Sequence, residues 1–302
     1  MMDSAQIVQN AWRAGLAAPA FNIPYLPMMD AVVRALVDTD SFGLVAVARL
    51  EFHKFEAQSL AAVRQTYRKF DGCPNVRLHL DHLPVIDEDY QRIDFAAEIR
   101  EAVNLGYESV MVDGSRLSLD ENIAATRQAV VLAHEGGVPC EAELGAVMGH
   151  GSGPLPPYDE LFESGKGFTD PDEAARFVAE SGCDWLSVAV GSIHGAIAPG
   201  VKDRKKLAAR LDLAHLERLR DATGIPLVLH GGTGIPRDYI LGAIQRGIAK
   251  INVATEIRQP YERALRETGE VEQARQAVYE RTVWVMKEHF ALAGTHKTLV
   301  GE

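Results

Sequence analysis

Short apolar runs alternate along the chain with longer amphipathic stretches. In five places a glycine ends an amphipathic stretch, and a run that is apolar on both faces follows within three residues. These runs are SVMVDG after Gly106, PCEAELG after Gly137, DWLSVAVG after Gly182, PLVLHGG after Gly224 and KINVAT after Gly247. Glycine suits the left-handed residue that ends a helix, and strands apolar on both faces are typical of buried parallel sheets. The pattern therefore predicts a repeated strand–helix unit.

The first third of the chain shows the same alternation more faintly. The elements expected there are strands at 20–23, 44–48 and 76–81 and helices at 28–38, 55–70 and 90–104. With the five later runs this makes eight strands and at least eight helices, which predicts an α/β fold, a (β/α)8 TIM barrel with extra C-terminal helices. A doubly wound sheet is the alternative. It would favour a glycine fingerprint after the first strand, where the chain has Phe21-Asn22-Ile23-Pro24.

The alternation continues without an interdomain linker, so we expect a single barrel domain over residues 1–302. Residues 149–169 are rich in Gly and Pro and form the longest irregular segment, and we expect a long active-site loop there. A simple surface excursion is the alternative. Residues 259–302 have a helical pattern and are expected to form a C-terminal helical extension, packed outside the barrel or against another subunit.

Composition and charge narrow the class of partner. The chain has 31 Lys plus Arg against 42 Asp plus Glu, a net charge of −11, which argues against a nucleic-acid or anionic membrane surface. Its cysteines, Cys73, Cys140 and Cys183, are odd in number and form no CxxC pair, which favours a reducing compartment. The N-terminal segment MMDSAQIVQN lacks a basic n-region and a long apolar core. These features predict a cytoplasmic protein with a small-molecule partner.

Polar residues gather where the predicted strands end. The residues at or just beyond these ends are Asn22, Asp81, His82, Asp113, Glu143, His194, His230 and Asn252. In TIM barrels the C-terminal ends of the strands carry the active site. We therefore expect these side chains to face one another at the mouth of the barrel.

Three of these strand-end residues are histidines, although the chain has only 10 in all. A single histidine there would most simply cap its strand by hydrogen bonding to the backbone. Three on one face favour a catalytic zinc bound by His82, His194 and His230, with a further position left for water or substrate. Glu143 is a candidate alternate ligand or a carboxylate near the metal, and an ion pair at the barrel mouth is its alternative role. His79 shares a strand face with Asp81 and is either a supporting residue or an interior histidine.

The segment from His230 to Pro236, HGGTGIP, carries a second signal. A strand ends, glycines expose backbone N–H groups, and a helix is expected to begin near Pro236. Such loops bind anions, and TIM barrels often hold phosphate after the seventh and eighth strands. Gly195, Gly231, Thr233 and residues 252–255 could line this site. A simple chain reversal is the alternative.

Six segments, in order along the chain, resemble a known family. They are HLDH (79–82), VMVDGS (110–115), EAELG (141–145), VAVGSIHG (188–195), LHGGTG (229–234) and KINVATE (250–256), with FNI (21–23) and ENI (121–123) in support. Over residues 20–258 the chain resembles the class II, zinc-dependent fructose-bisphosphate aldolases. The NVATE form is similar to the shorter branch, which includes tagatose-bisphosphate and other ketose-bisphosphate aldolases.

The resemblance implies a role for each matching residue. Zinc would bind His82, His194 and His230, with the Glu143 carboxylate near it, and Asp81 would be the acid/base at the C4 hydroxyl of the substrate. The implied substrate and phosphate ligands are Asn22, Gly195, Gly231, Gly232, Thr233, Asn252 and Thr255. The family commonly adds a monovalent cation (Na+ or K+) beside the phosphate. It also implies a homodimer or homotetramer.

The chain departs from the family pattern after EAELG. The acid that handles the C3 proton in the family is missing from residues 149–153, GHGSG. Asp159, Glu160, Glu163 or His150 could serve instead.

Charged residues near the expected mouth are candidates for substrate contacts. Arg49 follows the second strand and Arg116 follows VMVDGS. Either could face an anionic substrate group, or lie on the surface with a packed stem. Lys202 and Arg258 are candidates for the distal phosphate.

The expected function is zinc-dependent, reversible aldol cleavage of a ketose bisphosphate, with fructose 1,6-bisphosphate as the first candidate. The products would be dihydroxyacetone phosphate and an aldehyde such as glyceraldehyde 3-phosphate. The enzyme alternative is cleavage of tagatose 1,6-bisphosphate or another ketose 1-phosphate. Alternatives of another class are a zinc hydrolase and a non-catalytic sugar-phosphate-binding protein. A Schiff-base lysine is not expected, because Lys250 is placed at the start of its strand.

Overall fold

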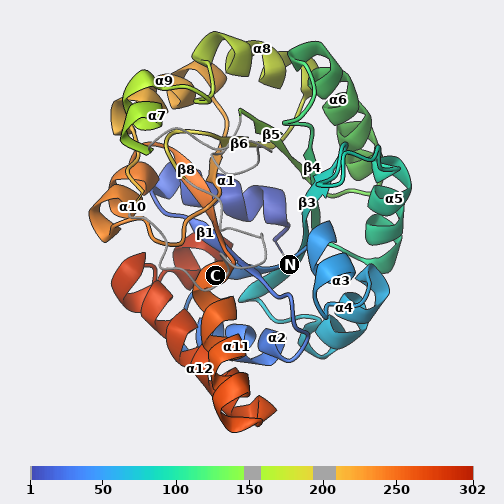
Figure 1. Ribbon diagram of the computed structural model, residues 1–302, viewed down its shortest axis with the longest axis vertical. Coiled ribbons are helices and arrows are strands. Elements are labelled where there is room, and N and C mark those ends of the chain that lie inside the picture. Colours follow the sequence, from blue (N-terminus) through green and yellow to red (C-terminus); the bar gives the residue numbers. More distant parts are fainter. Residues whose placement is uncertain (1, 146–157, 193–208, 302) are drawn as a thin grey trace.

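Eight parallel strands close into a barrel in the computed structural model, which describes residues 2–145, 158–192 and 209–301. The strands are β1 (Ala18–Asn22), β2 (Gly43–Ala48), β3 (Val76–Pro84), β4 (Ser109–Asp113), β5 (Cys140–Leu144), β6 (Trp185–Val188), β7 (Leu227–Leu229) and β8 (Ile248–Val253). Each strand pairs in parallel with the next, and β8 pairs with β1. Helices surround the strands in Figure 1. The predicted (β/α)8 barrel is confirmed.

Capping residues set the ends of several helices that lie before or between the strands. The helices that precede or connect the strands are α1 (Ser4–Ala14), α2 (Met28–Asp38), α3 (Arg49–Lys54), α4 (Leu60–Tyr67), α5 (Phe95–Leu105), α6 (Leu119–Glu135), α7 (Tyr158–Ser164), α8 (Pro171–Ser181), α9 (Leu213–Thr223) and α10 (Arg237–Ile244). At the start of α6, Ser118 and Glu121 form a capping box. The C-caps of α5, α8 and α9 are left-handed glycines, Gly106, Gly182 and Gly224.

Some predicted element bounds were wrong. The helix expected over 55–70 begins only at Leu60, because Ser59 accepts a hydrogen bond from the Ala62 N–H and caps α4 there, and a short 3-10 turn follows over 68–70. Helix α3, which precedes this range, was not expected. The helix expected from residue 90 begins at Phe95, after Asp94 caps it. Helix α7 lies within the segment expected to be irregular, of which residues 149–157 are outside the described residues.

Helix α1 closes the N-terminal end of the barrel. Its buried Ile7, Val8 and Ala11 belong to one apolar cluster with interior residues of the strands such as Trp185. In Figure 1 this helix lies across the far side of the strands. Because apolar side chains fill this end of the barrel, an open polar site is expected at the opposite end, at the C-terminal ends of the strands.

The C-terminal helices pack on the outside of the barrel. They are α11 (Thr255–Thr268), α12 (Val271–Trp284) and α13 (His296–Val300). Helix α12 packs against α11 and α2, and these helices lie together at one side of the barrel in Figure 1. Helix α11 starts only two residues after β8, so its N-terminus stays at the mouth. No helix in the described part of the chain is long and apolar enough to cross a membrane.

Candidate metal centre

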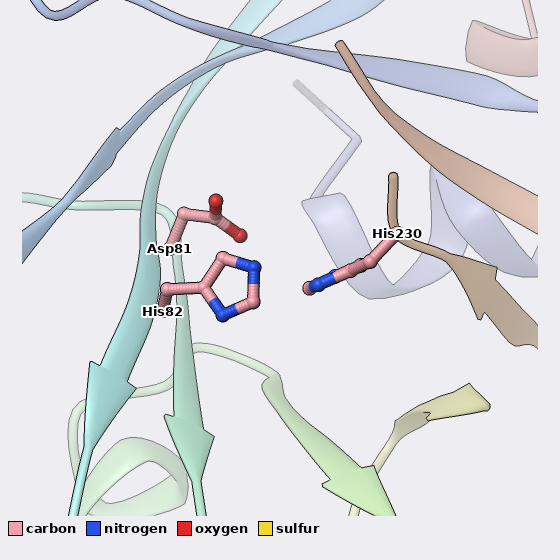
Figure 2. Close-up of side chains that lie close together, drawn as sticks. All are labelled: Asp81, His82 and His230. Carbon is pink, nitrogen blue, oxygen red and sulfur yellow. The ribbon is translucent and has the colours of Figure 1, made fainter. Parts of the chain in front are cut away.

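Asp81 and His82 are adjacent on β3, yet both reach the mouth of the barrel. Successive side chains of a regular strand point to opposite faces. Here the β3–β4 register shifts between Leu80 and Leu83, and His82 takes a positive φ of 37°. This bulge turns the strand so that the two side chains lie next to each other and face His230 (Figure 2). A positive φ outside glycine is costly and is found where a site requires it.

His230, directly after β7, faces His82 across the barrel mouth. The two rings lie 4.3 Å apart between centroids. Nδ1 of His230 is 3.3 Å and Nδ1 of His82 is 3.8 Å from the same carboxylate oxygen, Oε2 of Glu143. His230 Nε2 lies 2.9 Å from Oε1 of Glu141. When the Nε2–H donates a hydrogen bond to that carboxylate, Nδ1 carries no proton and its lone pair is directed toward His82 and Glu143.

Negative charge surrounds these two rings. Asp81, Asp113, Glu141 and Glu143 are all buried at the mouth or just beneath it. Burial alone favours a neutral ring, but Asp81, Asp113 and Glu143 raise the pKa of His82 to about 10. Burial and the nearby His82 lower the pKa of His230, but hydrogen bonds to Glu141 and Glu143 raise it overall. The buried carboxylates around His82 and His230 therefore favour the presence of a positive charge between them, either a proton or a bound cation.

The donor atoms at the mouth fit a divalent metal. Two groups of three offer ligand atoms within 4.8 Å of one another: Asp81 with His82 and His230, and His82 with Asp113 and Glu143. Imidazole nitrogens with carboxylate oxygens suit zinc and related first-row metals. His194, the third predicted histidine ligand, lies outside the described residues, as do Gly195, Lys202 and His150.

The Asp81 carboxylate is held by two amides. Asn22 Nδ2 donates to Oδ2 and Asn252 Nδ2 donates to Oδ1, each at 2.8 Å. Burial favours the neutral acid, but His82 and Lys250 hold the pKa of Asp81 well below its usual value. An ionised carboxylate only accepts protons and hydrogen bonds. Asp81 is therefore available as a base at the wall of the candidate metal centre.

Two charged residues of this network, Glu141 and Lys250, were missed from the sequence. Lys250 is the third residue of β8, not its first, and its Nζ lies 2.8 Å from Glu141 Oε2 in the barrel interior. Strand alternation could have found both, because Lys250 shares a face with Asn252 and Glu141 shares one with Glu143. His79 lies between this pair and Asp81: its Nε2 is 3.7 Å from Glu141 Oε2 and 3.6 Å from Asp81 Oδ1. Its Nδ1 is 2.9 Å from Ser109 Oγ.

A third missed residue, Glu51, lies at the start of α3. Its Oε2 accepts a hydrogen bond from the Ala48 N–H at 2.7 Å and from Asn22 Nδ2 at 3.4 Å. Burial, reinforced by the charge of Asp81, raises the pKa of Glu51 to about 8. Glu51 therefore holds on to its proton at neutral pH while it supports one of the amides that bind Asp81.

Stability should respond to pH through Glu51. The unfolded chain releases the Glu51 proton near its ordinary pKa of 4.5, and the folded chain keeps it until about pH 8, so stability falls as pH rises between these values. We expect Glu51→Gln to match wild type at pH 5 and to exceed its unfolding free energy by roughly 1–3 kcal/mol at pH 8. Denaturant unfolding at both pH values measures this, with exposed Glu267→Gln as the control. An equal effect of Glu51→Gln at pH 5 and pH 8 would refute it.

The loop after β7 lies against the N-terminus of α11. Gly231 and Gly234 have positive φ values of 70° and 84°. A side chain at Gly232 would approach the Asn252 carbonyl oxygen to 3.0 Å. Thr233 Oγ1 accepts a hydrogen bond from the Glu256 N–H at 3.2 Å, in the first turn of α11. Flexible glycines and a helix N-terminus together are typical of an anion site.

The predicted arginines have partners within the chain. Arg49 Nε lies 2.9 Å from Glu98 Oε1, and Arg116 donates to the Asp87 carbonyl oxygen. Arg258 Nη1 lies 2.6 Å from Glu262 Oε2, with its guanidinium 5.6 Å from the centroid of the Phe55 ring. Of the predicted alternative acids, Asp159 pairs with Arg210, and Glu160 and Glu163 lie on α7.

The fold and the site together define a (β/α)8 protein with a candidate metal centre at the C-terminal ends of its strands. The family model described as "Fructose-bisphosphate aldolase class-II" matches residues 2–298. The chain therefore belongs to the class II fructose-bisphosphate aldolase family, which confirms the resemblance seen in its motifs. It is an aldolase, a carbon–carbon lyase, and its family is generally metal-dependent.

Curated relatives cover most of the chain. A fructose-bisphosphate aldolase of Geobacillus stearothermophilus is 32% identical over 274 residues, covering 88% of this chain and 85% of that protein. One from Streptococcus pyogenes is 34% identical over 286 residues, covering 93% and 87%. Among solved structures, the YdjI aldolase from Escherichia coli K12 has a TM-score of 0.78 at 29% identity, covering 97% of this chain and 98% of that one.

Proposed function

We propose that this aldolase carries out zinc-dependent, reversible cleavage of a ketose bisphosphate, with fructose 1,6-bisphosphate as the first substrate to test. The products are dihydroxyacetone phosphate and glyceraldehyde 3-phosphate. One observation carries the proposal: the Asp81 carboxylate, held by two amides, lies beside His82 and faces His230. This arrangement places a base next to two imidazoles that can hold a metal.

His82, His194 and His230 would hold the zinc, with Glu143 as an alternate ligand. Bound there, zinc supplies a Lewis acid for the C2 carbonyl oxygen of the ketose. Asp81 accepts the proton of the C4 hydroxyl while the C3–C4 bond breaks, so C4 leaves as an aldehyde and the bonding electrons remain with C3 and the C2 oxygen. A second acid protonates C3 and completes dihydroxyacetone phosphate. Its candidates are still Asp159, Glu160, Glu163 and His150.

The loop after β7 is proposed to bind the C1 phosphate. Backbone N–H groups of Gly231 and Gly232, the Thr233 hydroxyl and the N-terminus of α11 at Thr255 support this assignment. Gly195 joins them by its motif, and a Na+ or K+ ion is expected beside the phosphate. Asn22 and Asn252 would contact the sugar from either side of Asp81. Arg258 and Lys202 are still the candidates for the distal phosphate, and Arg49 and Arg116 for another anionic group.

A substrate screen tests the proposed reaction. Purified protein is assayed for aldehyde release from fructose 1,6-bisphosphate, tagatose 1,6-bisphosphate and ketose 1-phosphates, with and without added zinc. We expect zinc-dependent release of dihydroxyacetone phosphate, with the highest kcat/KM for a ketose bisphosphate. Release of a carboxylic acid would favour the hydrolase instead. Binding of dihydroxyacetone phosphate without exchange of its C3 proton with solvent would favour the non-catalytic reading.

The proposed function also suggests a location in the cell, a metabolic role and an oligomeric state. The three cysteines are free thiols, which supports a reducing, cytoplasmic location. We further propose a role in glycolysis or related carbohydrate metabolism and a homodimer or homotetramer. Light scattering coupled to size-exclusion chromatography measures the subunit number directly.

A further inference from the structure

Lys250 is a fully buried lysine for which the proposed reaction has no role. Its Nζ lies 2.6 Å from Asn252 Oδ1, 2.8 Å from Glu141 Oε2 and 3.8 Å from Asp81 Oδ1. All four side chains are buried in the barrel interior. A lysine is rarely buried completely unless it is paired, because removing an ammonium from water is costly. The function of Lys250 is therefore expected to depend on its charge and its N–H donors, which a buried leucine lacks.

The contact with Lys250 determines which way the Asn252 amide points. An ammonium group has three donors and no acceptor, so the amide atom facing it must be the oxygen. The amide nitrogen then faces Asp81 and donates to Oδ1 at 2.8 Å. In the reversed orientation the nitrogen would face the ammonium and the oxygen would face the carboxylate, and both contacts would be repulsive. Lys250 and Asp81 therefore select the same amide orientation.

Glu141 also holds the ammonium. Its Oε2 pairs with Lys250, and its Oε1 lies 2.9 Å from His230 Nε2. The other oxygen of Asp81 is held independently by Asn22, whose amide contacts Glu51 at 3.4 Å. Removal of Lys250 would thus release one amide that holds Asp81 and leave the other in place.

We propose that Lys250 is a positioning residue, which fixes the Asn252 amide so that it holds the Asp81 carboxylate in the orientation that accepts the substrate proton. This inference rests on the proposed function, because Asp81 is the proton acceptor there. Proton transfer depends steeply on the placement of the acceptor. Lys250 therefore acts on kcat through Asn252, without contact with the substrate.

The test is a double-mutant cycle between Lys250 and Asn252 in the otherwise wild-type protein, in which the Glu141 carboxylate still accepts from His230 Nε2. Lys250→Met is expected to lower kcat for ketose cleavage by about 100-fold, with a smaller change in KM and no loss of bound metal. When Asn252→Ala is also present, Lys250→Met is expected to have almost no further effect on kcat, because the two residues act in series. Lys250→Gln, which retains an N–H donor, should fall between Lys250→Met and the lysine. If Lys250→Met does not fold, the double-mutant cycle with Asn252→Ala is measured with Lys250→Gln instead.

Crystal structures of the wild-type protein and of the Lys250→Met or Lys250→Gln variant give a readout besides activity. The expected result is a rotated Asn252 amide or Asp81 carboxylate only where Lys250 is replaced. An unchanged Asn252–Asp81 pair, an unchanged kcat, or independent effects of Lys250 and Asn252 would overturn the proposal. If wild type cleaves no ketose phosphate, the proposed function fails, and these structures alone decide the role of Lys250.

Discussion

Replacing Asp81 by alanine is expected to lower kcat for ketose cleavage by about 10³-fold, within the range for loss of a general base. The structure gives the reason: Asp81 is the buried carboxylate that two amides hold beside His82. The Asp81→Ala protein should still bind its metal, because His82 and His230 keep their places. Steady-state kinetics with metal analysis of the same preparation measures both effects.

Two variants accompany this experiment as controls. Asp81→Asn keeps the volume of the side chain but removes the base, so its kcat should fall nearly as far as that of Asp81→Ala. Asp89→Asn changes an aspartate whose side chain is 70% exposed and should leave cleavage unchanged. Undiminished turnover in either Asp81 variant would rule out Asp81 as the proton acceptor.

Removing the metal should have the other large effect. Chelation is expected to lower cleavage by about 10³-fold or more, because a Lewis acid supplies several kcal/mol of charge stabilisation. Added zinc should restore activity at about one ion per chain. His230→Ala should lose both metal and activity, because this ring lies fully buried opposite His82.

His134→Ala is the matched control for the histidine variant. His134 lies in the last turn of α6, half exposed, and pairs with Asp184, which directly precedes β6. It therefore lies where strands begin, opposite the mouth of the barrel. It should keep both metal and activity. Full cleavage by a preparation shown to contain no metal would contradict the proposed mechanism.

The barrel could be predicted because its signal is repeated. The runs at β4 to β8 each follow a glycine, and a buried parallel strand is apolar on both faces wherever it occurs. Helix α1 was not predicted, because it lies outside the alternating series, although its capping residues Asp3 and Gly15 are local signals that could have found it. The late start of α4 at Leu60 depends on a single capping serine, Ser59, a weak signal inside an amphipathic stretch.

The candidate site was predictable in its residue types but not in its network. Strand-end positions indicated Asp81, His82 and His230, yet only the bulge at His82 shows how neighbouring residues reach one face. Strand alternation places Lys250 and Glu141 on the interior face of the barrel, but only the structure shows that they pair there. The pairs Lys250–Glu141 and Asn252–Asp81 join residues more than a hundred positions apart. A local sequence pattern carries no information about such pairing.

The central claim is that His82, His194 and His230 hold one catalytic metal beside Asp81. Anomalous diffraction at the zinc edge, from crystals of active enzyme, tests it most directly. The account predicts one strong peak about 2.0–2.1 Å from ring nitrogens of His82 and His230, with His194 as the third histidine. A peak elsewhere, or rings turned apart with no ion between them, would contradict it.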